Sequence, residues 1–100
     1  MLKISVIESP NERRLILEGK LIAAWVIELR TAFEKARANL QNREVVIELK
    51  NLAAISEEGE NVLLELLNER VTFRGSGVFA KEVLRQLARR MRNNSQETSR

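Results

Sequence analysis

The chain has 100 residues, enough for one domain with a single hydrophobic core, and 44% of them are hydrophobic. It contains no Cys, no His, no Tyr and no Asp, so all 14 acidic residues are Glu. These absences exclude disulfides, deprive zinc and redox metals of their usual ligands, and rule out the Ser-His and Cys-His pairs of nucleophilic enzymes. The composition therefore predicts a protein that is not an enzyme and that holds neither a metal nor another cofactor.

The net charge of +3 is not spread evenly along the chain. Residues 81–100 carry six basic and two acidic side chains, whereas residues 1–80 carry eleven basic and twelve acidic ones. A nucleic-acid-binding protein would spread Lys and Arg over one face of its body, so the distribution argues against a nucleic-acid partner. No run approaches the ~18 apolar residues that span a bilayer, and the N-terminus lacks the pattern of a signal peptide. We therefore expect a cytoplasmic protein that touches a membrane only through a partner.

The first half of the chain predicts two strands, a helix and a third strand. Residues 2–8 and 13–18 alternate apolar and polar side chains, and the Pro-Asn turn between them is short enough for an antiparallel hairpin. Residues 25–40 repeat apolar side chains at three- and four-residue spacing, as in an amphipathic helix. Residues 45–49, VVIEL, are nearly all apolar, which is typical of a strand covered on both faces. A strand–helix–strand unit makes a right-handed crossover, so this strand lies parallel to the second.

A second helix is expected to begin shortly after the central strand, with residues 50–55 as the connecting loop. Ser56 suits the N-cap, because its hydroxyl can accept a hydrogen bond from the free backbone N–H groups of the first turn. Glu57 and Glu58 follow in that turn, where the helix dipole favours negative charge. Gly59 falls on the buried side of the helix, and its missing side chain permits a close approach to the sheet.

The last part of the chain predicts a short strand over residues 71–74 and a helix over residues 78–92. Between them lies a permissive turn, Gly75, Ser76 and Gly77. This turn is a possible anion-binding site, because free N–H groups and the helix dipole converge where a helix begins.

Lys81, Arg85 and Arg89 fall at four-residue spacing and form a basic stripe on this last helix. Such a stripe is either a solvated face or a surface for an acidic partner or anionic lipids. Residues 93–100, NNSQETSR, are polar, and we expect them to be disordered. The predicted fold class is α/β: one domain over residues 1–92, with a four-stranded, mostly parallel sheet, an N-terminal antiparallel hairpin and three helices packed against it.

Three short segments occur in the order and at the spacing of a known family. They are LEGKL at residues 17–21, VVIEL at residues 45–49 and ISEEG at residues 55–59. Together with the order of elements, they resemble the STAS domain, the family of anti-sigma factor antagonists, over residues 2–92. In that family the last segment reads as an apolar residue followed by Asp-Ser-Ser/Thr-Gly.

The chain departs from the family pattern at this last segment. Ser56 stands at the Asp, Glu57 at the first Ser, and Glu58 at the Ser or Thr that partner kinases phosphorylate. Gly59 is retained, and Ile22 replaces an Asp that is common after the second strand. Glu58 cannot be phosphorylated, but its single negative charge partly imitates a phosphoserine, which carries about −1.5 to −2. The resemblance thus implies a STAS-like domain whose phosphorylation switch is replaced by a fixed charge.

Two readings stay open at the residues that the resemblance singles out. Glu57 and Glu58 either serve only the helix dipole or face a binding partner, and Ser56 is either a structural cap or a modified residue. Trp25, the sole Trp, is either a partly buried core residue or an interface anchor.

The function that the resemblance implies is regulation by protein–protein contact, in bacterial signalling and transcription control, with an anti-sigma factor kinase or another STAS-binding protein as partner. The partner-binding residues would be Ser56, Glu57, Glu58, Gly59 and Trp25. Two alternatives remain: a sensor of a nucleotide or another anion, and an accessory subunit of a membrane transport ATPase.

Overall fold

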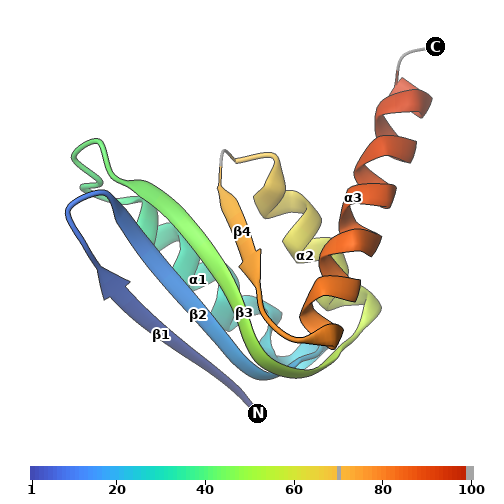
Figure 1. The fold of residues 1–100 in the computed structure, drawn as a ribbon, viewed down its shortest axis with the longest axis horizontal. Coiled ribbons are helices and arrows are strands. Elements are labelled where there is room, and N and C mark those ends of the chain that lie inside the picture. The colour runs from blue at the N-terminus through green and yellow to red at the C-terminus, as the bar shows by residue number, and fades with distance from the viewer. Residues whose placement is uncertain (70, 99–100) are drawn as a thin grey trace.

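The computed structural model describes residues 1–69 and 71–98, with side chains described up to Arg92. Four strands, a short 3-10 helix and three α-helices follow one another along the chain: β1 (Leu2–Glu8), β2 (Glu12–Leu21), η1 (Ala23–Trp25), α1 (Val26–Arg37), β3 (Glu44–Ile55), α2 (Glu57–Leu67), β4 (Thr72–Gly75) and α3 (Val78–Thr98). The predicted number and order of strands and helices are confirmed (Figure 1). Over the described residues, none of the helices is long and apolar enough to cross a membrane.

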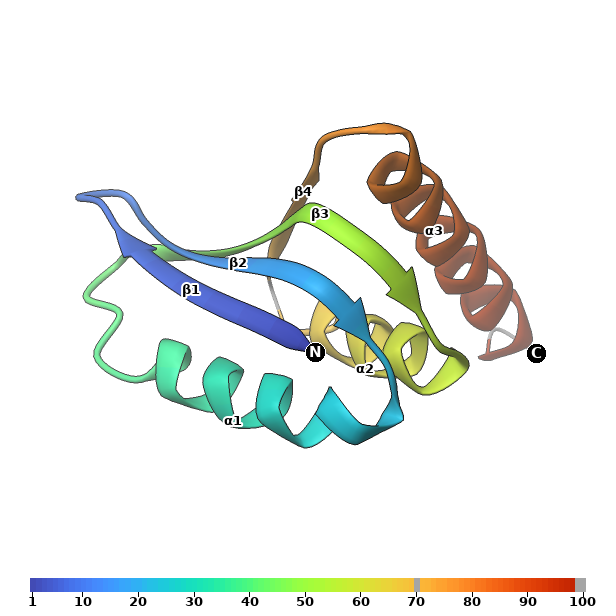
Figure 2. The same cartoon turned by 90° about the horizontal axis from the view of Figure 1, so that it is seen from below.

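The strands form one sheet in the order β1-β2-β3-β4. β1 pairs antiparallel with β2, and the two remaining pairings are parallel, which confirms the predicted hairpin and mostly parallel sheet. Figure 2 shows α1 and α2 side by side under the same face of the sheet, as two right-handed crossovers in succession require. α3 lies beyond them and packs against β3, β4 and α2. The C-terminal ends of β2, β3 and β4 therefore point toward the segments where the three helices begin.

The predicted loop at residues 50–55 is wrong, because β3 continues to Ile55. Its last residues pair with β2, and Gly19 lies opposite Leu52 and Leu21 opposite Ile55. The register shifts twice in this region, and Asn51 adopts a positive φ of 51°. β-Bulges of this kind place extra residues in one strand without ending its pairing. Polar Lys50 and Asn51 resemble a loop in the sequence, but they form an irregularity inside a strand.

Helix α1 is shorter than the predicted span of residues 25–40. It begins at Val26 and ends at Arg37, and three of the residues that follow have positive φ: Asn39, Gln41 and Asn42. Asn tolerates the left-handed conformation better than most residues, so these side chains suit a tight irregular turn. The apolar spacing continued past the helix end because Leu40 still packs against the core.

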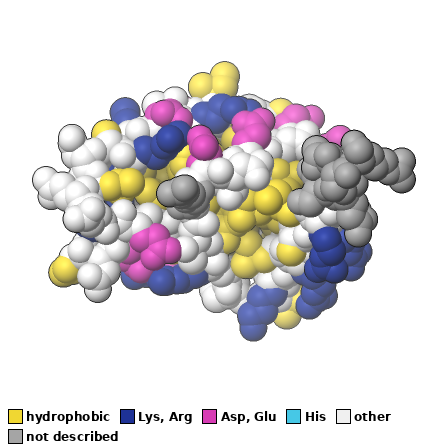
Figure 3. All heavy atoms as spheres, turned by 90° about the horizontal axis from the view of Figure 1, so that it is seen from above, with side chains coloured by type: hydrophobic (Ala, Val, Ile, Leu, Met, Phe, Trp, Pro, Cys, Tyr) yellow, Lys and Arg dark blue, Asp and Glu magenta, His cyan; other side chains and the backbone are white. Residues whose placement is uncertain are grey.

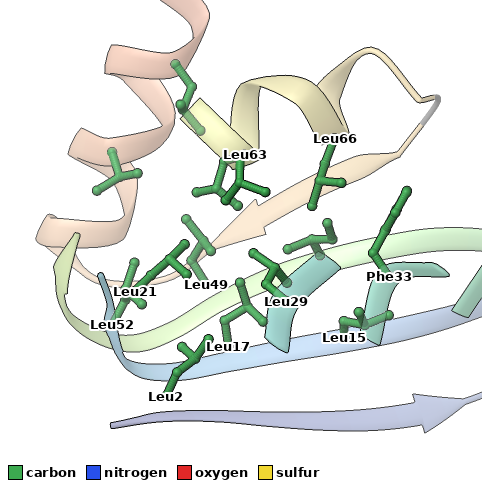
Figure 4. Close-up of a cluster of buried hydrophobic side chains, with 14 of the residues drawn as sticks. Leu2, Leu15, Leu17, Leu21, Leu29, Phe33, Leu49, Leu52, Leu63 and Leu66 are labelled. Carbon is green, nitrogen blue, oxygen red and sulfur yellow. The ribbon is translucent and has the colours of Figure 1, made fainter. Parts of the chain in front are cut away.

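The core lies between the sheet and the helices (Figure 4). Leu15 and Leu17 of β2 and Leu49 of β3 point toward α1 and α2, and their side chains are completely buried. Leu29 and Phe33 of α1 and Leu63 and Leu66 of α2 approach them from the helix side. The alternation predicted for β2 and the apolar stripes predicted for the helices produce this layer directly.

Over residues 1–69 and 71–98, no helix covers the opposite face of the sheet, yet two apolar residues on that face are buried. Val46 is completely buried and Ile16 is 7% exposed. Charged side chains cover them: Arg74 of β4 reaches across β3 to Glu12 of β2 with two hydrogen bonds of 3.0 and 3.1 Å. Arg14 pairs with the same Glu12 and with Glu48. This network replaces a helix layer as the cover of the open face.

Helix α3 extends to Thr98, six residues past the helix end predicted at residue 92. The side chains of residues 93–98 and the whole of residues 99–100 lie outside the described part of the chain. The expectation that residues 93–100 form a disordered tail therefore stays a prediction.

Candidate functional site

The site begins with a backbone contact between the end of β2 and the start of α2. The N–H of Ser56 donates to the carbonyl oxygen of Leu21 at 3.0 Å. This hydrogen bond comes directly after the last paired residues, Leu21 and Ile55, of the two strands. The first turn of α2 is thereby tied to the segment that leads into η1.

Ser56 is the N-cap of α2. Its backbone is extended, with φ −91° and ψ 172°, and its hydroxyl accepts a hydrogen bond from the N–H of Gly59 at 3.2 Å. Its carbonyl accepts the first intrahelical bond, from the N–H of Glu60 at 2.9 Å. The cap predicted from the sequence is confirmed, and the Ser56 hydroxyl is already engaged in it.

Gly59 lies where α2 approaches the end of β2 most closely, and it is buried. A Cβ at this position would overlap the carbonyl oxygen of Leu21 and would lie 3.0 Å from the Ile55 side chain. No real Cβ makes contacts so short with a backbone atom, so the packing requires Gly here. Gly59 therefore positions the helix start but presents no side chain to a partner.

Glu57 and Glu58 are the side chains that this helix start exposes. Glu60, in the same turn, is half-buried and pairs with Arg90 of α3 at 3.3 Å. Among the described residues, no ion pair involves Glu57 or Glu58. Both carboxylates stand at the positive end of the helix dipole, which favours their charge without neutralising it. The first turn of α2 thus presents two exposed carboxylates on a backbone that the Ser56 cap holds in place.

Trp25 lies beside this corner, because η1 packs against α2. The Trp25 side chain is half-buried and packs against the core, so only part of it is accessible to a partner. The structure brings the five predicted site residues to the same edge of the sheet. We call the exposed surface formed by Ile22, Glu57 and Glu58 the acidic corner.

Ile22 is a member of the acidic corner that sequence reasoning did not assign to the site. It follows Leu21 directly and is 36% exposed. The sequence did contain a signal: an apolar residue where the resembling family commonly has Asp. In the structure, this residue follows Leu21, whose carbonyl binds the start of α2, so an apolar side chain stands near Glu57 and Glu58.

The turn Gly75, Ser76 and Gly77 lies at the start of α3, apart from the acidic corner. The N–H of Ser76 donates to the carbonyl of Leu49, with a distance of 3.4 Å. A Cβ on Gly75 would lie 2.9 Å from the Leu84 side chain, so this Gly lets α3 approach β4. Gly77 has a φ of +89°, and this left-handed conformation favours Gly over residues with a side chain. The anion site at this turn stays a prediction.

Comparison with known proteins identifies the fold. No protein-family model matches the chain, and no curated protein matches it in sequence. Among solved structures, it is similar to an uncharacterised protein of the DUF3478 family with a SpoIIAA-like fold from Shewanella loihica PV-4. The TM-score is 0.56 at 19% sequence identity, and the match covers 92% of this chain and 77% of the other. The chain therefore has a SpoIIAA-like fold, which agrees with the fold that the sequence resemblance implied.

Proposed function

We propose that this protein is a non-catalytic regulatory module that binds another protein through its acidic corner. The observation that carries the proposal is the exposure of Glu57 and Glu58 at the first turn of α2 in a SpoIIAA-like fold. In the family that the sequence resembles, this turn is the switch that partner kinases phosphorylate. A partner would be an anti-sigma factor, a related kinase or another STAS-binding protein of the bacterial cytoplasm.

The proposed mechanism is docking onto a preorganised surface. The Ser56 cap and the close approach at Gly59 fix the backbone of the first turn. This backbone therefore loses little conformational entropy when a partner binds. Preorganisation of this kind lowers the entropic cost of association. Because Glu58 is permanently charged, the module binds constitutively or is regulated at another place. A basic pocket on the partner would face the two carboxylates, while Ile22 supplies an apolar contact.

Site-specific crosslinking tests where the partner docks. Glu58 is replaced by the photoreactive residue p-benzoylphenylalanine in cells of the source organism, and adducts are identified by mass spectrometry. Glu28 is the matched control, because it is also an exposed Glu in the first turn of a helix, α1. We expect a specific adduct from position 58 and none from position 28. The absence of an adduct at 58, or the same adduct at both positions, contradicts the proposal.

Charge variants then measure the contribution of the carboxylate to the partner's affinity. Calorimetric titration of the captured partner is repeated with Glu58→Lys, Glu58→Gln and Glu28→Gln. Loss of one member of a close charge pair typically costs about 2 kcal/mol or more in binding, which corresponds to roughly thirtyfold in Kd. The expected order of affinity is Glu28→Gln equal to the natural chain, then Glu58→Gln, then Glu58→Lys. Equal affinities throughout would show that the corner charge does not take part.

The two alternative functions have less support. An anion sensor at the turn before α3 would need free N–H groups, and that of Ser76 already has an acceptor. A thermal-shift screen tests it, because a ligand at a hundredfold excess over Kd stabilises the folded state by about 2.7 kcal/mol. An accessory role in a transport ATPase predicts that the crosslinked partner is a transporter subunit.

A further inference from the structure

A groove of about 450 Å³ opens between the C-terminal half of α2, strand β4 and helix α3. Its lining is apolar throughout: Leu67, Phe73, Leu84, Leu87, Ala88 and Met91. Figure 3 shows it as a continuous hydrophobic surface in the middle of this view, with Lys and Arg side chains beside it. Of these six residues, Leu87 alone is buried, and Ala88 is exposed. We call this surface the α3 groove.

The groove exists because α3 diverges from α2. Arg90 holds the two helices together near the start of α2, where it contacts Glu60 at 3.3 Å and Asn61 at 2.7 Å. The C-terminal end of α2 points away from α3, and the two helices form a V that is open at the top of Figure 1. β4 is an edge strand of four residues and is too short to fill the space between them.

The wall that α3 forms has a basic border outside the apolar lining of the groove. Lys81, Arg85 and Arg92 follow one another at three- and four-residue steps with Ala88, so they share a side of the helix with the groove lining. Over residues 78–92, the part of α3 with described side chains, Glu82 is the one acidic residue, and it pairs with Arg85 at 2.7 Å. An exposed ion pair of this kind contributes little to stability. One carboxylate also cannot neutralise three cations, so this wall keeps a net positive charge.

Two acidic residues near the C-terminal end of α2 do not compensate this charge, because they pair with α1; Glu60, near the start of α2, pairs with Arg90 of α3. Glu65 pairs with Arg30 of α1, and Glu69 pairs with Arg37 of α1 at 2.9 Å. Arg74 of β4 is likewise held by Glu12, on the open face of the sheet. The α3 groove therefore combines an apolar floor with one wall whose cations lack acidic counterparts among the described residues of the neighbouring elements.

We propose that the α3 groove is a second docking surface, which binds an amphipathic helix of a protein partner with an acidic flank. The lining of α3 from Leu84 to Met91 covers two turns, about 10 Å, which matches apolar residues at i, i+3, i+4 and i+7 of a docked helix. Acidic residues along one flank of that helix would face Lys81, Arg85 and Arg92. This surface is separate from the acidic corner, so the two proposals stand or fall independently.

The charge and shape of the groove favour this occupant over two others. A second copy would bring its own α3 against the first, and five of the fifteen residues 78–92 are basic, so the two helices would repel each other. An anionic membrane would suit the basic wall, but a bilayer receives apolar side chains that project from a surface. Here the apolar side chains are recessed between two walls, and the floor residue Leu87 is 1% exposed.

Fluorescence anisotropy with a designed peptide tests the proposal. The probe is a fluorescein-labelled peptide helix with Leu at i, i+3, i+4 and i+7 and Glu along one flank, and its counterpart carries Lys in place of Glu. The full chain is compared with Ala88→Glu, which places a carboxylate in the groove, and with Gln86→Glu. Gln86 is an exposed residue on the opposite side of the same helix, so its variant makes the same change of charge outside the groove.

We expect saturable binding of the Glu peptide, weaker by about tenfold or more in Ala88→Glu and for the Lys peptide, and unchanged in Gln86→Glu. Circular dichroism verifies that both variants are folded. The proposal is overturned by absence of saturable binding, by equal binding of the two peptides, or by equal loss in both variants. It is also overturned if sedimentation shows a self-association that Ala88→Glu abolishes, or if phosphatidylglycerol vesicles bind the groove and the Glu peptide does not.

Discussion

The two ends of helix α2 differ in how tightly they pack against the rest of the protein. At its N-terminus, Gly59 and the Ser56 cap bring the backbone close to Leu21, and the exposed side chains of the first turn are the carboxylates of Glu57 and Glu58. At its C-terminus, Leu67 stands beside an apolar groove that neighbouring elements leave uncovered. A tight backbone junction holds charged side chains in a fixed geometry, whereas a gap between diverging helices leaves apolar surface exposed. The first suits recognition of a charge, and the second suits insertion of side chains.

The largest expected effect comes from breaking the tight end with Gly59→Ala. The new methyl group would overlap the Leu21 carbonyl, so α2 must shift away from the sheet. Overpacking of this kind costs about 1–3 kcal/mol, measured as the change in unfolding free energy in urea. Glu58→Gln, one residue earlier and exposed, is the control and should stay within a few tenths of a kcal/mol. Equal stabilities of Gly59→Ala and the control would show that the junction is not tight.

Removal of the cap is expected to have the next largest effect. Ser56→Ala deletes the acceptor of the Gly59 N–H, and loss of an N-cap costs about 1 kcal/mol. The thermal midpoint of a domain of this size should fall by about 4–8 °C per kcal/mol. Ser76→Ala is the matched control, because the hydrogen bond of Ser76 is made by its backbone. A fall of the same size in both variants would contradict the specific role of the cap.

Part of the acid sensitivity is expected to arise on the open face of the sheet, away from both ends of α2. Burial raises the pKa of the Glu12 carboxyl, but the hydrogen bonds from Arg74 and Arg14 outweigh it and hold this pKa below its ordinary value. A carboxyl with a lowered folded-state pKa stabilises the fold above its unfolded-state pKa. That contribution is lost as the pH falls through the folded-state value.

Urea unfolding between neutral pH and acid measures this dependence. The natural chain should lose stability below about pH 5, and Glu12→Gln should show a shallower loss because the titrating group is gone. Arg74→Gln removes the hydrogen-bond donor and should flatten the profile in the same direction. Parallel profiles in all three proteins would contradict the assignment to this network.

The smallest stability effect is expected at the open end of α2. Ala88→Gln adds a polar side chain to an exposed position of the α3 groove, so the unfolding free energy should change by less than about 0.5 kcal/mol. The same substitution at the completely buried position Leu63 would be strongly destabilising. A large loss in Ala88→Gln would mean that the groove is a closed part of the core, and the contrast between the two ends would disappear.

Local pattern predicted much of the fold and of the acidic corner. The two-residue alternation of β2, the apolar run of β3 and the three- and four-residue spacing of the helices each depend on residues close in the sequence. The cap at Ser56 is likewise local, because donor and acceptor are three residues apart. These features therefore depend on local sequence and not on tertiary contacts.

The sequence by itself thus determined the type and order of the elements and the capped acidic turn at the start of α2. Only the tertiary structure decided that β3 continues through a bulge to Ile55, because its partner is Gly19–Leu21 of a distant strand. It also decided that Gly59 must be Gly, because the obstructing atom belongs to Leu21. The α3 groove depends on the angle between two helices, and periodicity shows which face is apolar without showing what covers it.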